Sequence, residues 1–132
     1  MPTHLYRSPV PEQLWNRIRD EFTLPTLEQV RERFAAVHED PEPATRQLIR
    51  VFIDEETYCP GFQFHPDLSL NPVVVRVFER AMELRIPHNY FALWMMVRSP
   101  DLHGRRPVDL RNAGDPSPLL GALGQIRDEL AA

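Results

Sequence analysis

Residues 87–110 read PHNYFALWMMVRSPDLHGRRPVDL, an almost entirely apolar run followed by a turn bounded by two prolines. Pro87 can begin a helix because the first helical position needs no backbone donor, and Pro100 prevents the helix from continuing. The sequence therefore predicts a short helix over 88–97. Its residues leave almost no polar face, which predicts burial on several sides, by neighbouring helices or by a partner. We expect its large side chains, including Trp94, to lie in the core.

The turn after this run carries two adjacent arginines, Arg105 and Arg106. Gly104 permits a tight bend, Pro107 can begin a new helical turn, and Asp109 then lies near unpaired backbone donors. A capped turn between two helices accounts for these three residues without a further role. Two adjacent arginines in a turn cannot both fold inward, so at least one is expected to face water or a partner.

Other helices are predicted from apolar residues at helical spacing and from the caps that bound them. Over 43–52 a helix is expected, although Ile49, Val51 and Ile53 also alternate as a strand would. The aromatic segment 60–64 is interpreted as an irregular strap whose rings point to opposite sides if it is extended. The predicted fold class is all-α, a compact bundle of about six short helices with this strap before the fourth. The predicted helices cover residues 11–22, 27–37, 43–52, 72–85, 88–97 and 117–130.

Length and composition indicate one compact unit. The chain has 132 residues, 42% of them hydrophobic, and its 14 prolines favour short helices separated by stiff turns. Within this unit, residues 1–57 are expected to form an N-terminal helical region and residues 58–132 a second helical domain. The single cysteine excludes an internal disulfide and suits a reducing compartment. No apolar run approaches the ~20 residues that span a bilayer, so we expect a cytoplasmic protein without a membrane partner.

Charge is divided unevenly along the chain. All 15 basic residues counted as Lys or Arg are arginines. Residues 1–70 hold 7 Arg and 12 Asp or Glu, a net charge of −5, whereas residues 71–132 hold 8 and 7, a net charge of +1. An acidic N-terminal half is a poor match for a phosphate backbone. Residues 1–57 still allow a degenerate helix-turn-helix, so DNA binding stays an alternative, with Arg46 and Arg50 as phosphate contacts.

Catalysis and cofactor binding are not predicted. The five histidines lack the spacing of metal ligands, and Cys59 with His65 lacks a third group that would orient a thiol and its base. The glycines at Gly121 and Gly124 lack the lysine and the strand of a phosphate loop. We therefore expect a protein that is not an enzyme and that holds no cofactor and no metal.

The order of the motifs along residues 58–130 is similar to that of a known family. The strap precedes a helix that begins at a proline, an aromatic helix, the segment Leu-x-Gly-Arg-Arg-Pro-Val-Asp-Leu at 102–110 and a final leucine-rich helix. This arrangement resembles the toxin-binding domain of the Xre/MbcA/ParS antitoxins. The motif residues that carry the resemblance are Phe62, Gln63, Phe64, Trp94, Gly104, Pro107, Asp109 and Leu110.

The resemblance implies an antitoxin of a bacterial type II toxin–antitoxin pair, whose partner is a RES-domain toxin that consumes NAD. Neutralisation would be steric, with the C-terminal segment 126–132 lying across the mouth of the toxin's NAD pocket. The resemblance also implies a homodimer. The partner-binding residues expected on this basis are Arg105, Arg106, Ile126, Arg127, Asp128, Glu129 and Leu130.

In this interpretation Arg127, Asp128 and Glu129 make polar contacts and Leu130 is an apolar plug. The same leucine-rich stripe would also arise if the last helix merely closed the bundle. Two other functions stay open, a DNA-binding transcriptional autoregulator and a protein-interaction module that neutralises no toxin. An adjacent reading frame that encodes a RES-type protein would discriminate among the three.

Overall fold

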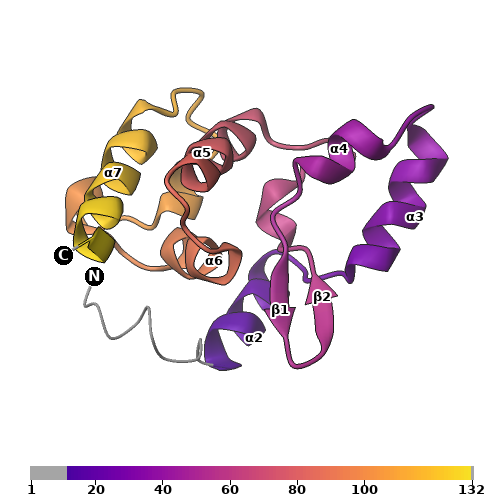
Figure 1. The fold of residues 1–132 in the computed structure, drawn as a ribbon, viewed down its shortest axis with the longest axis horizontal. Helices are drawn as coiled ribbons and strands as arrows, with labels where there is room; N and C mark the ends of the chain where they lie inside the picture. The colour runs from indigo at the N-terminus through magenta and orange to yellow at the C-terminus, as the bar shows by residue number, and fades with distance from the viewer. Residues whose placement is uncertain (1–11, 132) are drawn as a thin grey trace.

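A computed structural model of the chain describes residues 12–131, with side chains to Ile126. Six α-helices lie in this range, together with a two-stranded sheet and three 3-10 turns (Figure 1). The fold is mostly helical, as predicted, but the sheet corrects the all-α class. The α-helices are α2 (Glu12–Glu21), α3 (Leu27–Val37), α4 (Glu42–Arg46), α5 (Pro72–Glu83), α6 (His88–Met96) and α7 (Ser117–Ala131). The other elements are β1 (Val51–Ile53), β2 (Glu56–Tyr58), η1 (Gly61–Gln63), η2 (Pro100–Leu102) and η3 (Pro107–Leu110).

The hairpin of β1 and β2 shows that the predicted helix over 43–52 is wrong beyond its first turns. Helix α4 ends at Arg46, and residues 51–53, of which Val51 and Ile53 are β-branched, form β1, which pairs antiparallel with β2. Val51 is fully buried and lies opposite Tyr58, whereas the residue after Val51 is exposed. A strand is favoured over a helix here, because β-branched side chains fit the half-buried surface of a sheet well and alternate between its two faces.

The side-chain amide of Asn89 covers the open edge of β1. The Phe52 N–H donates to Asn89 Oδ1 at 2.8 Å, and Asn89 Nδ2 donates to the Phe52 carbonyl at 3.0 Å. These two bonds imitate a neighbouring strand and connect the hairpin to the first turn of α6.

Caps mark the helix beginnings that the sequence predicts correctly. Gln29 N–H donates to Thr26 Oγ1 at 3.1 Å and Thr26 N–H donates to Gln29 Oε1 at 2.9 Å, which makes a capping box before α3. Asn71 Oδ1 accepts from two backbone N–H groups of α5, and Pro72 is the first residue of that helix. Pro87 precedes α6 as its cap residue, so α6 itself begins one position later.

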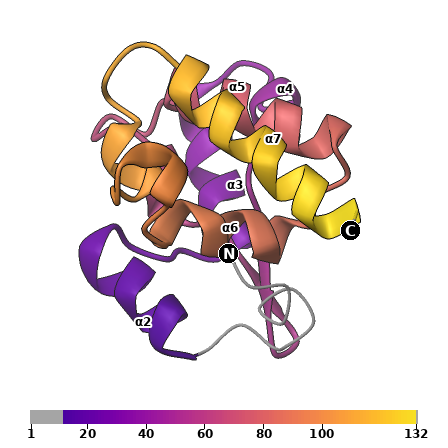
Figure 2. The ribbon, with the colours of Figure 1, turned by 90° about the vertical axis from the view of Figure 1, so that its left-hand side faces the viewer.

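Helix α6 occupies the centre of the main hydrophobic cluster, which confirms its prediction as a core helix. Residues 90–96 are all buried. Helix α2, strand β1 and η3 pack against α6, while α5 and α7 pack side by side across it (Figure 2). The cluster includes side chains from Leu14 to Ile126, so the regions on both sides of residue 58 contribute to one core.

A second, smaller cluster lies under α3, on the far side of the hairpin from α7 (Figure 1). Its buried members are Val30, Phe34, Leu48 and Cys59.

The strap joins the two clusters through its two phenylalanines. Phe62 is 1% exposed and belongs to the main cluster, whereas Phe64 packs edge-on against Phe34 of the second cluster, with ring centroids 6.2 Å apart. The strap is irregular, as predicted, and it contains the 3-10 turn η1. The two rings diverge, because one lies within the turn and the other just after it.

Gln63, between these rings, is a fully buried polar side chain whose amide is satisfied by the backbone. Its Oε1 accepts from the Ile49 N–H at 2.8 Å, and its Nε2 donates to the carbonyls of Ile49 and Pro60, each at 3.0 Å. The amide thus holds the strap to the segment before β1, and each group it pairs is removed from water.

Replacement Gln63→Ala is expected to lower the free energy of unfolding by about 2–4 kcal/mol, because it leaves buried backbone groups of Ile49 unpaired. The exposed Gln47 provides the matched control, and Gln47→Ala should change stability by less than about 0.5 kcal/mol. Urea unfolding followed by circular dichroism measures both. Equal effects of the two substitutions would contradict a structural role for the buried amide.

Candidate partner-binding surface

The arginine turn, residues 98–106, folds back on itself through residues with left-handed backbone. His103 has a φ of 58° and Gly104 a φ of 79°. The Gly104 N–H donates to the Ser99 carbonyl at 2.9 Å, and the Ser99 N–H donates to the Arg105 carbonyl at 3.0 Å. The turn is therefore closed by its own backbone bonds, and the glycine occupies a conformation that other residues adopt at a cost.

Arg106 points inward and links the arginine turn to the end of α2. Its guanidinium donates to both carboxylate oxygens of Glu21, at 3.0 and 3.1 Å, and to both oxygens of Asp109, at 2.9 Å each. Only 20% of its side chain is exposed. These bonds from the Arg106 guanidinium hold the pKa of Asp109 below its usual value, and the same two carboxylates raise the pKa of Arg106.

Arg105 is the member of the pair that faces solvent. The residue is exposed, and its Nε donates to the Leu102 carbonyl at 3.0 Å. Among the described residues it makes no ion pair, so the outer edge of its guanidinium is open to an acidic group.

The remaining motif residues of this region serve the fold. Trp94 is 2% exposed, and its ring lies 5.7 Å from that of Phe91. Pro107 is buried and begins η3, and Leu110 is half-buried against the main cluster. These residues of the motif therefore form a packed connection between α6 and α7.

Helix α7 is anchored by a buried stripe. Leu119, Leu123 and Ile126 are 1%, 0% and 5% exposed, and the helix packs against α5 and η2. Ile126 was expected to contact a partner, but its side chain lies in the main cluster. The helix continues to Ala131, while the side chains of Arg127, Asp128, Glu129 and Leu130 lie outside the described part of the structure.

Helices α2 and α3 do not form a common core, which bears on the DNA-binding alternative. The buried residues of α2 belong to the main cluster and those of α3 to the second cluster. Helix α4, which follows α3, has 5 residues. A helix-turn-helix needs two helices packed on one another with a recognition helix long enough to lie in the major groove. Neither pairing supplies that arrangement in residues 12–46.

The cysteine considered as a nucleophile is buried and closed to solvent. Cys59 is 0% exposed, and burial raises the pKa of its thiol to about 11, so the thiol is protonated at neutral pH. No group of three metal-ligating side chains occurs within residues 12–126. None of the helices described here is both long and apolar enough to cross a membrane.

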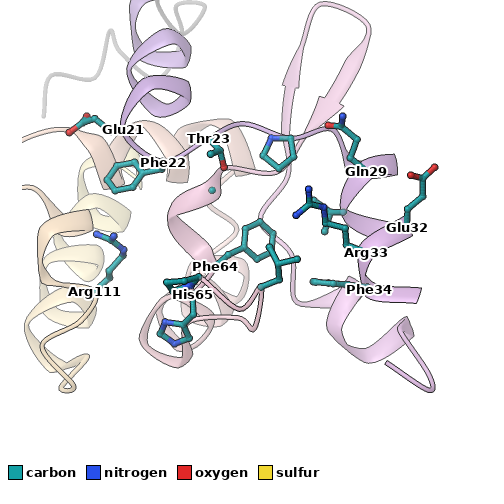
Figure 3. A pocket seen from close by; sticks show the side chains of 15 residues that line it. Glu21, Phe22, Thr23, Gln29, Glu32, Arg33, Phe34, Phe64, His65 and Arg111 are labelled. Carbon is teal, nitrogen blue, oxygen red and sulfur yellow. The ribbon is translucent and has the colours of Figure 1, made fainter. Parts of the chain in front are cut away.

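A groove of about 680 Å³ opens between α3, the end of α2 and the strap (Figure 3). Its walls come from three separate segments of the chain and from Arg111 after η3. Sequence reasoning missed it, because no local pattern reports which distant segments meet.

The pH dependence of stability tests the link made by Arg106. A carboxylate whose pKa is lowered by folding stabilises the native state above its unfolded pKa, and this contribution is lost as the pH falls through its folded pKa. Asp109→Asn should therefore lower stability at pH 7 by less than about 1 kcal/mol, as expected for a partly exposed pair. The difference from the original chain should shrink as the pH falls below 3.8, the usual pKa of Asp.

Urea unfolding at a series of pH values measures this difference. Asp101→Asn, at an exposed carboxylate without a described hydrogen bond, is the control and should show no such trend. A constant difference between Asp109→Asn and the original chain down to pH 2 would contradict the ion-pair interpretation.

Comparison with known proteins leaves the resemblance to rest on the motifs themselves. No family model, curated protein or solved structure matches the chain.

Proposed function

We propose that this protein is the antitoxin of a bacterial type II toxin–antitoxin pair and that it neutralises a RES-domain, NAD-consuming toxin by binding it. The order of motifs along residues 58–130 supports the proposal. The observation that carries it is that η2, which lies just before the two arginines, packs against α7. Both segments are thereby fixed on one body and can engage a single partner.

Inhibition in this proposal is steric, and the blocking part is the last turn of α7. The buried side chains of Leu119, Leu123 and Ile126 hold the helix on the body, and the helix runs on to Ala131. A helix that is ordered before binding loses little conformational entropy in the complex. Residues 127–131 would cover the mouth of the NAD pocket, and no bond in either protein would be made or broken.

Arg105 would contribute selectivity and speed of association. Its exposed guanidinium can form two parallel hydrogen bonds with an acidic group of the toxin. Arg106 is already committed to Glu21 and Asp109, so in this proposal it positions the turn and does not contact the toxin directly.

Co-expression with the product of an adjacent RES-type reading frame tests the proposal. The RES-type protein alone should stop growth and deplete cellular NAD, and co-expression of this chain should restore both. The two proteins should also co-purify as a complex. A RES-type neighbour whose toxicity this chain does not relieve would overturn the proposal, as would the absence of such a neighbour.

Deletion of residues 127–132 tests the blocking role of α7. This deletion retains Ile126 and with it every core residue that the structure describes, so helicity should fall only by the residues removed. We expect the shortened chain still to co-purify with the toxin but to leave NAD consumption active. Undiminished inhibition by the shortened chain would show that α7 only closes the bundle.

Replacement Arg105→Ala should weaken the complex roughly fivefold, mostly through slower association. The reason is that it removes an exposed charge that contributes about 1 kcal/mol to the binding free energy. Arg31→Ala, at an exposed arginine of α3, is the matched control. Surface plasmon resonance at low and moderate salt separates the association rates. Equal association rates for the two variants would exclude Arg105 from the interface.

A further inference from the structure

The groove beside the strap has an aromatic floor that the fold builds in advance. Phe64 lies in its middle, with Phe22 at one end and Phe34 at the other (Figure 3). Phe22 and Phe64 are half-buried, so part of each ring stays open to the groove, whereas Phe34 is 1% exposed. Such a floor favours an apolar or aromatic side chain of a ligand.

Gly61 allows the strap to approach the end of α2 closely beside this floor. Its N–H donates to the Thr23 carbonyl at 3.0 Å, and a Cβ at this position would collide with the Phe22 carbonyl. The strap and the connection between α2 and α3 therefore meet backbone to backbone, which only glycine permits. This contact holds the strap against the end of α2 at one edge of the groove.

Two glutamates line the groove, and neither carboxylate is directed at its middle. Glu21 is bonded to Arg106, which it shares with Asp109, and the carboxylate of Glu32 points away in Figure 3. Arg33 extends from α3 toward the middle of the groove and makes no ion pair among the described residues. A ligand that enters would therefore meet a free guanidinium beside the rings.

Arg111 supplies a second cation at the opposite end. Its guanidinium carbon lies 4.8 Å from the centroid of the Phe22 ring, and its Nη1 donates to the Val108 carbonyl at 2.7 Å. Partial burial lowers the pKa of Arg111, although the nearby Asp109 carboxylate acts to raise it. A carboxylate placed here would restore the solvation that folding removes.

We propose that this groove binds an acidic peptide segment of a partner protein, with one apolar side chain on Phe64 and flanking carboxylates on Arg33 and Arg111. Two arginines suit the few carboxylates of a short peptide, whereas the phosphate backbone of a nucleic acid would need a longer row of cations than the lining of this groove provides. No residue of α7 up to Ile126 lines the groove. The peptide site goes beyond the proposed toxin-blocking function, and the two proposals can be tested independently.

Titration of the isotopically labelled protein with a synthetic peptide, monitored by amide NMR, tests this site. The probe is acetyl-Glu-Asp-Leu-Phe-Asp-Glu-amide, and its counterpart carries Lys at each acidic position. The acidic peptide should shift the Gly61 and Phe64 amides saturably, with a dissociation constant below about 1 mM. Binding should weaken as salt is raised, and the basic peptide should leave these amides unchanged.

Arg33→Gln should weaken binding of the acidic peptide at least about fivefold, which corresponds to the loss of one charged contact. Arg31→Gln, two residues earlier on α3 and outside the groove, is the matched control and should bind like the original chain. Because Arg33 is exposed and unpaired, its replacement leaves the fold intact, and the spectrum without peptide verifies this.

Three results would overturn the proposal. They are the absence of saturable shifts at the groove, equal binding of the acidic and basic peptides, and equal weakening by the two arginine variants. The same amides could instead shift when the protein alone is concentrated. If the peptide does not reverse these shifts, the groove would be assigned to a second copy of the chain. Loss of toxin inhibition with intact peptide binding would refute only the antitoxin proposal.

Discussion

Complete burial of residues 90–96 sets the requirements for the rest of the molecule. A helix with no polar face must receive apolar neighbours on every side, and a single short partner cannot supply them. Helix α2, strand β1 and η3 therefore all pack on α6, and the paired helices α5 and α7 close the remaining side. This requirement explains why the N-terminal region and the motif-bearing region share one hydrophobic cluster.

The core places α2 beside the arginine turn, and the Arg106 guanidinium makes use of that placement. An ion pair at this degree of exposure contributes little to stability by itself. Its larger effect is on the groove, because it engages the carboxylate of Glu21 at one end, and neither groove arginine makes an ion pair among the described residues. The same bond therefore shapes both surfaces, since it directs Arg106 inward and leaves Arg105 to solvent.

Local signals in the sequence predict the elements better than they predict the surfaces. Thr26 and Asn71 identify helix beginnings because a cap acts over two or three residues. The residues after Arg46 were predicted as helix, since their apolar spacing fits a helix and a strand equally well, and only the pairing with β2 decides between them. The bonds of Arg106 to Glu21 and of Gln63 to Ile49 join distant positions, so neither partner could be read from the sequence.

The arrangement separates a rigid scaffold from two surfaces of different chemistry. The strap couples the two hydrophobic clusters, because Phe62 enters one and Phe64 the other, and Gln63 ties both to the segment before β1. A peptide on Phe64 would therefore lie across the junction of the clusters, whereas a partner on α7 would touch the main cluster alone. Binding at the groove would involve α3 and the strap, whereas α7 is held in place by its own buried stripe. The two surfaces are thus expected to act independently in binding energy, although one fold presents both.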